Sequence, residues 1–267
     1  KDEAGLVQKA VSSLKAKRYS SALEPLRDLS QNYMISDKAQ DYRLELMHAE
    51  YRAREFESAA ETANQFITMY PHERFVDYAL YIRALSLYKS YNDWVPKKFK
   101  IHLGGRDIQP LAEAKNALDI ILTKFPQSRY AYQASHLLVK VEETIAQRDF
   151  TIAKSYYDRS AYLASLERLG KVVKTTQEDG LLLKSLTMMS KNYKKILITM
   201  MPILPHLSNE CFESIRKDNS KINWPTFDED QIKEDFSKIV IQINGRKRGL
   251  VNAKIDLLEE DLMKLVN

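Results

Sequence analysis

The chain contains a single cysteine, Cys211, in 267 residues. One thiol cannot form an internal disulfide or build a cysteine-based metal site, so we expect Cys211 to be a small apolar side chain on a helix face. Glycine and proline are also scarce, with seven and eight residues. This scarcity argues against a turn-rich all-β fold and favours helices, within a composition otherwise normal for a folded protein.

Residue patterns for catalysis and cofactor binding are lacking as well. The histidines are scattered, and none forms an HxxxH or HExxH pattern or has a cysteine nearby. Gly104 and Gly105 do not belong to a phosphate-binding loop, because the lysine and hydroxyl residue of that motif do not follow. We therefore expect no enzymatic activity, no cofactor and no metal site.

Neither a membrane span nor a strong charge imbalance is present. The net charge of +5 arises in the first 176 residues, where it is too dilute to indicate nucleic-acid binding. The most apolar window, 181–201, carries four lysines, each costing roughly 2.5–3.5 kcal/mol inside a bilayer. The first residues, KDEAGLVQKA, show no initiator Met and no apolar signal core, so we expect a mature or trimmed form.

A recurring phrase predicts the fold. In 52–71, RAREFESAAETANQFITMYP, the aromatic Phe56 and the small Ala59 lie three residues apart on one helix face, and Tyr70-Pro71 ends the helix. The same aromatic-x-x-small pattern returns along the first part of the chain. Its copies are Tyr19 and Ala22 (offset 37), Leu111 and Ala114 (offset 55), and Tyr162 and Ser165.

Repeats of about 34 residues, with small residues where two helices touch, are typical of a tetratricopeptide-type helical solenoid. We assign this domain to 1–176. An insertion at about 90–108 interrupts the third copy, and a long helix at 129–147 precedes a helix pair at 150–159 and 162–175. The alternative is an ordinary helical bundle in which the spacing is accidental.

The sequence pattern changes after residue 176. The whole chain is therefore predicted as mainly α, with the helical solenoid followed by a small helical elbow and a C-terminal α+β hairpin fragment. Domain 177–222 holds a long helix to about residue 201, prolines at 202 and 205, and a helix at 207–215. Domain 223–267 alternates Ile239, Ile241 and Ile243 with polar or β-branched residues before a turn at Asn244-Gly245. A closing helix is expected at 258–266.

The order of pieces in the first domain resembles the BamD family, the tetratricopeptide lipoproteins of the outer-membrane protein assembly machine. Three stretches carry the resemblance: REFESAAETANQFITMYPHERFVDYALYIRALSLY, RDIQPLAEAKNALDIILTKFPQSRYAYQA and AKSYYDRSAYLASLERLGKVV. The resemblance implies a non-enzymatic protein-binding scaffold of the Bam complex at the periplasmic face of the outer membrane. Its partners would be a BamA-like barrel insertase and unfolded outer-membrane protein clients, with membrane attachment only through a lipid anchor absent from this chain.

Two protein-binding surfaces follow. The first helices of the repeats line a groove of the kind in which extended peptides lie, although aromatic residues there can also be simple packing. The residues expected in this groove are Arg43, Met47, Glu50, Tyr78, Tyr81 and Arg83. The resemblance implies that a client C-terminal segment binds there. It also implies that the last helix pair, with Arg159, Arg168 and Lys174, contacts a periplasmic domain of the insertase.

The last part, 181–267, resembles the C-terminal end of leucyl-tRNA synthetase (leucine–tRNA ligase) through MMPILPHLSNECFESI and NWPTFDEDQIKEDFSKIVIQINGRKRGLV. No catalytic domain or HIGH-type sequence accompanies it. The resemblance implies tRNA contact by the basic hairpin residues Arg246, Lys247 and Arg248, which otherwise form a solvated turn.

Each resemblance is incomplete, and the two meet near 177–181. This predicts a junction between unrelated pieces, whether a natural fusion, an engineered chimera or an assembly artefact. The leading hypothesis is the outer-membrane scaffold. The alternatives are a tRNA-binding synthetase portion in the cytoplasm and a general peptide-binding repeat protein.

Overall fold

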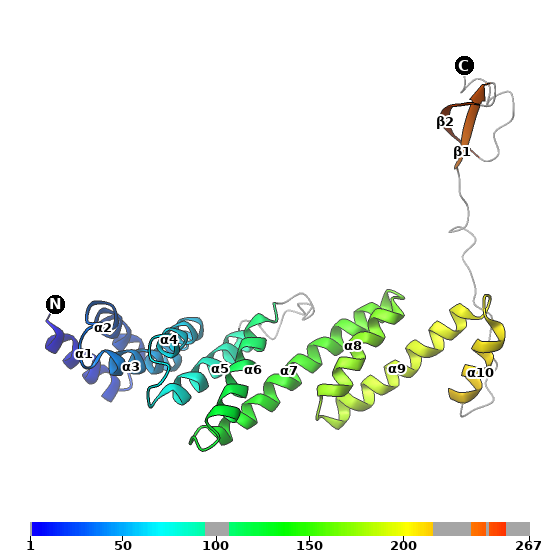
Figure 1. Cartoon of the computed structure of the whole chain (residues 1–267). Helices are drawn as coiled ribbons and strands as arrows, with labels where there is room; N and C mark the ends of the chain where they lie inside the picture. The colour runs from blue at the N-terminus through cyan, green and yellow to red at the C-terminus, as the bar shows by residue number, and fades with distance from the viewer. Residues whose placement is uncertain (1, 94–106, 216–235, 244–245, 255–267) are drawn as a thin grey trace. The chain divides into compact units, whose positions relative to one another are not determined.

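Helix pairs follow one another along the first two thirds of the chain (Figure 1). The computed structural model describes residues 2–93, 107–215, 236–243 and 246–254. By its internal contacts the chain divides into two compact units, Lys1–Ile196 and Leu197–Asn267, and each is described by itself. The predicted domains 1–176, 177–222 and 223–267 stay predictions.

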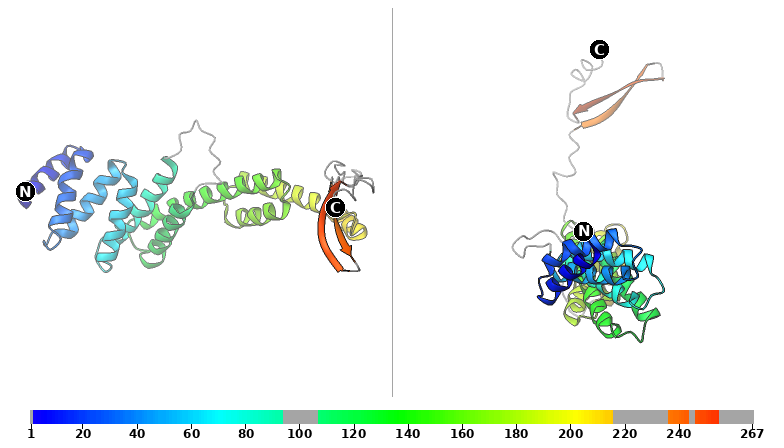
Figure 2. Two further views of the ribbon diagram at one scale, coloured as in Figure 1. Left: turned by 90° about the horizontal axis from the view of Figure 1, so that it is seen from above. Right: turned by 90° about the vertical axis from the view of Figure 1, so that its left-hand side faces the viewer.

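The first unit is a sequential array of helices, each packed on the next through α8. The left view of Figure 2 shows the same order of helices from above. The prediction of a mainly α, tetratricopeptide-like array is confirmed. Its helices are α1 (Glu3–Lys15), α2 (Tyr19–Asn32), α3 (Ala39–Arg52), α4 (Phe56–Met69), α5 (Val76–Asp93), α6 (Gln109–Lys124), α7 (Ala131–Asp158), α8 (Tyr162–Thr175) and most of α9 (Asp179–Met200).

The same turn joins α1 to α2, α3 to α4, and α7 to α8. Its central residue is left-handed each time, with φ of 55° at Lys17, 67° at Arg54 and 60° at Ser160. The next residue's N–H donates back five positions, each over 2.9 Å, in the manner of a Schellman motif. These donor–acceptor pairs are Arg18 to Ser13, Glu55 to Glu50, and Ala161 to Tyr156.

The turn explains the recurring phrase. The aromatic residue two positions after the left-handed residue begins the next helix, as Tyr19, Phe56 and Tyr162 do. The small residue three positions later faces the partner helix, where a larger side chain would hold the helices apart. Its copies Ala22, Ala59, Ala114 and Ser165 are all 0% exposed.

The core is nearly continuous along the array. One cluster of buried side chains joins α1, α2 and α3, and a larger one extends from α3 to α7 around Phe66, Leu111, Leu118 and Ile121. A third, smaller cluster brings Ala146 and Val172 together with Leu181 of α9. Burial of each large apolar side chain among them contributes roughly 1.5–3 kcal/mol relative to exposure.

Helix α7 differs from the prediction of a break between 147 and 150. It is one helix of 28 residues. No glycine or proline occurs in it, and its buried positions Ala146, Asp149 and Ala153 continue one packed face into the second half. Arg168 of α8 pairs with the Asp149 carboxylate over 3.0 Å. The polar residues that suggested a break therefore take part in a contact between two helices.

Helix α9 is held to α7 and α8. The Glu143 carboxylate accepts hydrogen bonds from the backbone N–H groups of Gln177 and Glu178, over 2.6 and 3.1 Å. The amide of Asn192 donates to Ser165 Oγ over 3.1 Å. The predicted long helix after residue 180 is confirmed.

The second unit contains helix α10 (Pro205–Ile215) and two antiparallel strands, β1 (Phe236–Ile243) and β2 (Arg246–Lys254). The register pairs Ile239 with Val251, and a bulge lies between Ile241 and Gln242. The predicted helix and hairpin are confirmed. The turn residues 244–245, the Trp224-Pro225 loop, the closing helix at 258–266 and residues 94–106 of the insertion lie outside the described residues.

Within the described part of the chain, no helix combines the length and the hydropathy needed to cross a membrane.

Candidate protein-binding surface

Five rings from four segments of the first unit meet on one partly exposed surface, which we call the aromatic cluster. Tyr81 and Tyr130 stack with their centroids 5.4 Å apart and an interplanar angle of 18°, and Tyr78 lies 5.3 Å from Tyr130. Tyr19 meets His48 edge-on at 6.1 Å. None of the five is fully buried, so the aromatic cluster forms a partly exposed surface that extends over four helix pairs.

Local structure fixes the rings of α5 and the residue before α7. Tyr78 and Tyr81 are three residues apart and therefore share one face of α5. Ser128 donates from Oγ to Asp77 over 2.5 Å and accepts the Tyr130 N–H over 3.0 Å. These bonds tie the segment before α7 to the start of α5, which brings Tyr130 over the two α5 rings.

One hydrogen bond joins His48 of α3 to Tyr78 of α5, with 2.9 Å between His48 Nδ1 and the phenol oxygen. Burial raises the pKa of Tyr78 well above its ordinary value, so the phenol keeps its proton. Burial likewise lowers the pKa of His48, despite the opposing charge of Glu45. With the imidazole proton on its other nitrogen, Nδ1 accepts from the phenol; with the proton on Nδ1, the imidazole donates to the phenol oxygen.

Arginine side chains border the aromatic cluster. The Arg52 guanidinium carbon lies 4.8 Å from the centre of the Tyr19 ring, and that of Arg129 lies 4.8 Å from the Tyr130 ring. Both arginines are exposed. Aromatic faces can pack on apolar side chains, and guanidinium groups can donate to carbonyl or carboxylate oxygens. The surface therefore offers aromatic faces and cationic hydrogen-bond donors, the two kinds of group to which an extended peptide binds.

Three predicted groove residues lie in the core. Arg43, Met47 and Glu50 are 4%, 0% and 2% exposed, because α2, α4 and α5 all pack on α3. Glu50 accepts from Thr62 Oγ1 over 2.7 Å and pairs with Arg27 over 3.1 Å. The structure thus gives Glu50 a role in joining α2, α3 and α4, and these three residues are left out of the surface.

The other three predicted groove residues have two different roles in the structure. Tyr78 and Tyr81 belong to the aromatic cluster, whereas Arg83 pairs with Glu113 of α6 over 2.8 Å and so links α5 to α6. Sequence reasoning missed Tyr19, His48 and Tyr130. The signal that could have found Tyr130 is its position directly before a first helix, after the aromatic-Pro ending of the preceding one.

The predicted second surface is not a single cluster. Arg159 closes the end of α7, where its Nε donates to the Ser155 carbonyl over 3.1 Å. Arg168 is engaged with Asp149, and Lys174 is exposed near the end of α8. Arg246, Lys247 and Arg248 begin strand β2 beside the turn, and their side chains are outside the described structure.

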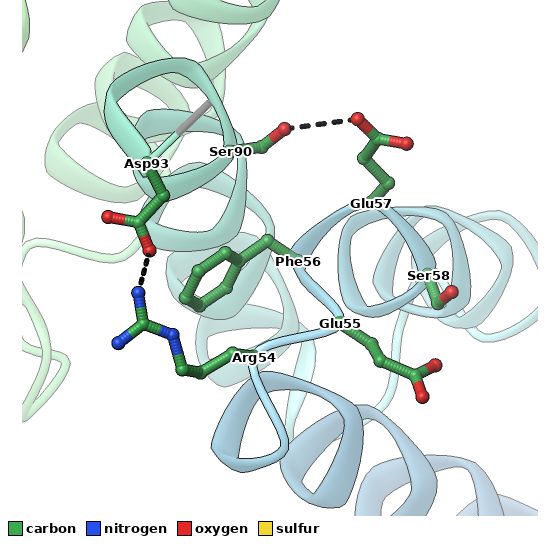
Figure 3. Close-up of a pocket in the computed structure, with 7 residues that line it drawn as sticks. All are labelled: Arg54, Glu55, Phe56, Glu57, Ser58, Ser90 and Asp93. Atoms are coloured by element: carbon green, nitrogen blue, oxygen red, sulfur yellow. Dashed lines mark hydrogen bonds and ion pairs between the residues drawn. The ribbon is translucent and has the colours of Figure 1, made fainter. Parts of the chain in front are cut away.

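A pocket of about 380 Å³ lies at the turn between α3 and α4 (Figure 3). Arg54 pairs with Asp93 over 2.5 Å, and Ser90 donates to Glu57 over 3.3 Å. Figure 3 shows the Phe56 ring between these two pairs. Two pairs of its polar side chains therefore connect the α3–α4 pair to α5, and Glu55 pairs with Arg27 of α2. The pocket thus lies at a contact between repeats, and we assign it no ligand.

Among the described residues, no group of three or more His, Cys, Asp or Glu side chains could hold a metal ion.

Comparison with known proteins matches residues 1–201 to the family model "YfiO: Outer membrane lipoprotein". The chain is 27% identical over 191 residues to the outer membrane protein assembly factor BamD of Neisseria meningitidis serogroup B, covering 72% of each chain. It is 24% identical over 194 residues to BamD of Vibrio cholerae serotype O1, covering 73% of this chain and 80% of that one. The family match continues through 181–201, past the predicted junction.

Proposed function

The chain belongs to the YfiO family of outer membrane lipoproteins, and we propose on that premise that it holds client and partner proteins on its helical repeats. It is a BamD-like, non-enzymatic assembly factor located at the periplasmic face of the outer membrane, as the sequence predicted. Because the chain belongs to this family, we set aside two alternatives: a general peptide-binding repeat protein and a cytoplasmic location.

The synthetase interpretation needs correction for 181–201. This stretch lies inside the family match, and α9 packs on α7 and α8 through Leu181 and Asn192. Tertiary contacts thus bind this helix to the repeats. The implied tRNA contact by Arg246, Lys247 and Arg248 has no support from the comparisons, and the proposal does not include it.

The aromatic cluster is the binding surface that we propose for an extended segment of a client protein. The observation that carries this is the partly exposed stack of Tyr81 and Tyr130 beside Arg129. An isolated ring on a repeat protein is ordinary packing, but stacked rings from two repeats beside a cation combine a partly exposed aromatic surface with a positive charge. An aromatic contact contributes about 0.5–1.5 kcal/mol beyond the area that it buries.

A second contact with a barrel insertase of the BamA kind is proposed at the α7–α8 end. Arg159 and Lys174 are exposed there, and Arg168 is partly exposed although it pairs with Asp149. These side chains offer separated positive charges rather than one pocket. Such charges are suited to pairing with acidic groups on a partner surface.

Fluorescence anisotropy with a labelled apolar–aromatic peptide of about eight residues in extended form tests the client-binding proposal. We expect Tyr81→Ala and Arg129→Ala each to weaken binding by roughly 5- to 10-fold, from the loss of one ring or cation contact. Tyr193→Ala is the matched control, since this tyrosine is 47% exposed on α9. Unchanged affinity in both cluster variants, with unchanged helicity, would exclude the aromatic cluster as the binding surface.

A further inference from the structure

A cleft of about 500 Å³ lies farther along α5, where that helix faces the middle of α7 and the start of α9. Tyr88 forms one wall, and Val139 and Lys140 of α7 form another. The positions 78, 81, 85, 88 and 92 follow each other by three or four residues, so they lie on one face of α5. The cleft therefore continues the face of α5 that carries Tyr78 and Tyr81.

The charged side chains around the cleft differ in their hydrogen-bond and ion-pair partners. Glu143 accepts hydrogen bonds from the N–H groups at the start of α9, which stabilise its negative charge. Arg148 lies 3.8 Å from Asp149. Lys140 is exposed, and in the described part of the chain its ammonium group makes no ion pair. Glu178, which is exposed, is the remaining acid among the lining residues.

The apolar part of the cleft is open as well. Val139 is 38% exposed, although it is β-branched and apolar, and Tyr88 is partly exposed opposite it. An apolar side chain seated between them would remove both from water. A carboxylate next to that side chain would come within reach of the flexible Lys140 ammonium group.

We propose that this cleft is a second subsite for the extended peptide that binds the aromatic cluster, and that it takes an apolar side chain together with a carboxylate. The inference rests on the proposed client-binding function. Tyr81 and Tyr88 are seven residues apart, which is about 10 Å along a helix. An extended peptide covers that length in about three residues. The favoured ligand thus carries an aromatic residue and, about three residues away, an apolar residue with a neighbouring carboxylate.

The carboxylate can belong to an acidic side chain or to a peptide C-terminus, and four labelled peptides separate these sources. One has aspartate about three residues after the aromatic anchor, and one has asparagine there. The other two end at that position, one with a free carboxylate and one amidated. All four are titrated against the full chain and against Lys140→Ala, with Lys154→Ala as the control because Lys154 is also an exposed lysine of α7.

We expect Lys140→Ala to weaken binding of at least one carboxylate peptide about fivefold, an effect that added salt reduces. The asparagine and amidated peptides should bind both proteins equally, and Lys154→Ala should match the parent. The carboxylate peptide that responds identifies the source. A reduction common to all four peptides, or none in any, overturns the second subsite. If Tyr81→Ala still weakens binding in that case, the aromatic cluster stands without it, and if Tyr81→Ala has no effect either, both proposals fail.

Discussion

His48 and Tyr78 share a hydrogen bond of 2.9 Å between the imidazole Nδ1 and the phenol oxygen, and this bond joins α3 to α5 inside the aromatic cluster. A neutral imidazole with its proton on the other nitrogen accepts the phenol proton at Nδ1, whereas a protonated Nδ1 donates to the phenol oxygen, so protonation of His48 sets the direction of the bond. The bond therefore links the protonation of one side chain to the arrangement of the aromatic cluster.

Stability should fall as pH decreases through the titration of His48. Burial lowers the pKa of His48 in the folded chain, so the unfolded chain binds more protons between that value and the ordinary value near 6.5. The stabilisation is complete above the unfolded value and is lost as pH falls below it. Melting temperatures between pH 8 and pH 5 measure this, and His48→Gln should flatten the curve. His136→Gln, at an exposed histidine, should not, and equal curves for both variants would contradict the assignment.

Phe66→Ala should be among the most destabilising single changes. Phe66 is 0% exposed, lies in the largest core cluster and contacts Tyr70 at 5.2 Å between ring centroids. Removing such a ring leaves a cavity and should cost about 3–5 kcal/mol in the free energy of unfolding. Denaturant unfolding measures the loss. Met69→Ala, at a position 52% exposed on the same helix, should cost less than about 0.5 kcal/mol.

Lys17→Gly should stabilise the chain. Lys17 has a φ of 55°, a conformation that costs L-residues about 1–2 kcal/mol and glycine little. After the greater freedom of glycine in the unfolded chain is subtracted, we expect a gain of roughly 0.5–1 kcal/mol. Thermal unfolding measures it. Lys9→Gly, at an exposed position inside α1, should instead lose about that amount, and a loss in both variants would rule out relief of strain.

Glu143→Ala should loosen α9 without unfolding the repeats. The change removes the acceptor of two backbone N–H groups and of the Thr176 hydroxyl. The loss of a comparable helix cap is about 1 kcal/mol. Hydrogen exchange should therefore quicken at 177–190 and stay unchanged in α3 and α4. Glu167→Ala, at a carboxylate 74% exposed, serves as the control and should leave exchange in α9 unaltered.

The local sequence was sufficient to predict the repeats, but it was not sufficient to predict which residues form the aromatic cluster. The aromatic-x-x-small phrase follows from one turn geometry, so Tyr19, Phe56 and Tyr162 could be aligned without a structure. Contact between Tyr81 and Tyr130 depends instead on how α6 spans the space between two first helices, which periodicity does not encode. The same limit applies to Arg43 and Glu50. Their charge suggested exposure, but α3 is covered by three other helices, and Glu50 is accommodated by Arg27 and Thr62.

The unbroken course of α7 has a mechanical consequence. Tyr130 directly precedes the helix and Arg159 directly follows it, so the proposed client surface and the proposed partner surface lie at opposite ends of one rod. At 1.5 Å per residue, its 28 residues make that rod about 42 Å long. A continuous helix resists bending far more than a loop does. A tilt imposed at one end of α7 would therefore displace the other end as well. Had the helix broken near residue 148, a joint there would have absorbed the displacement.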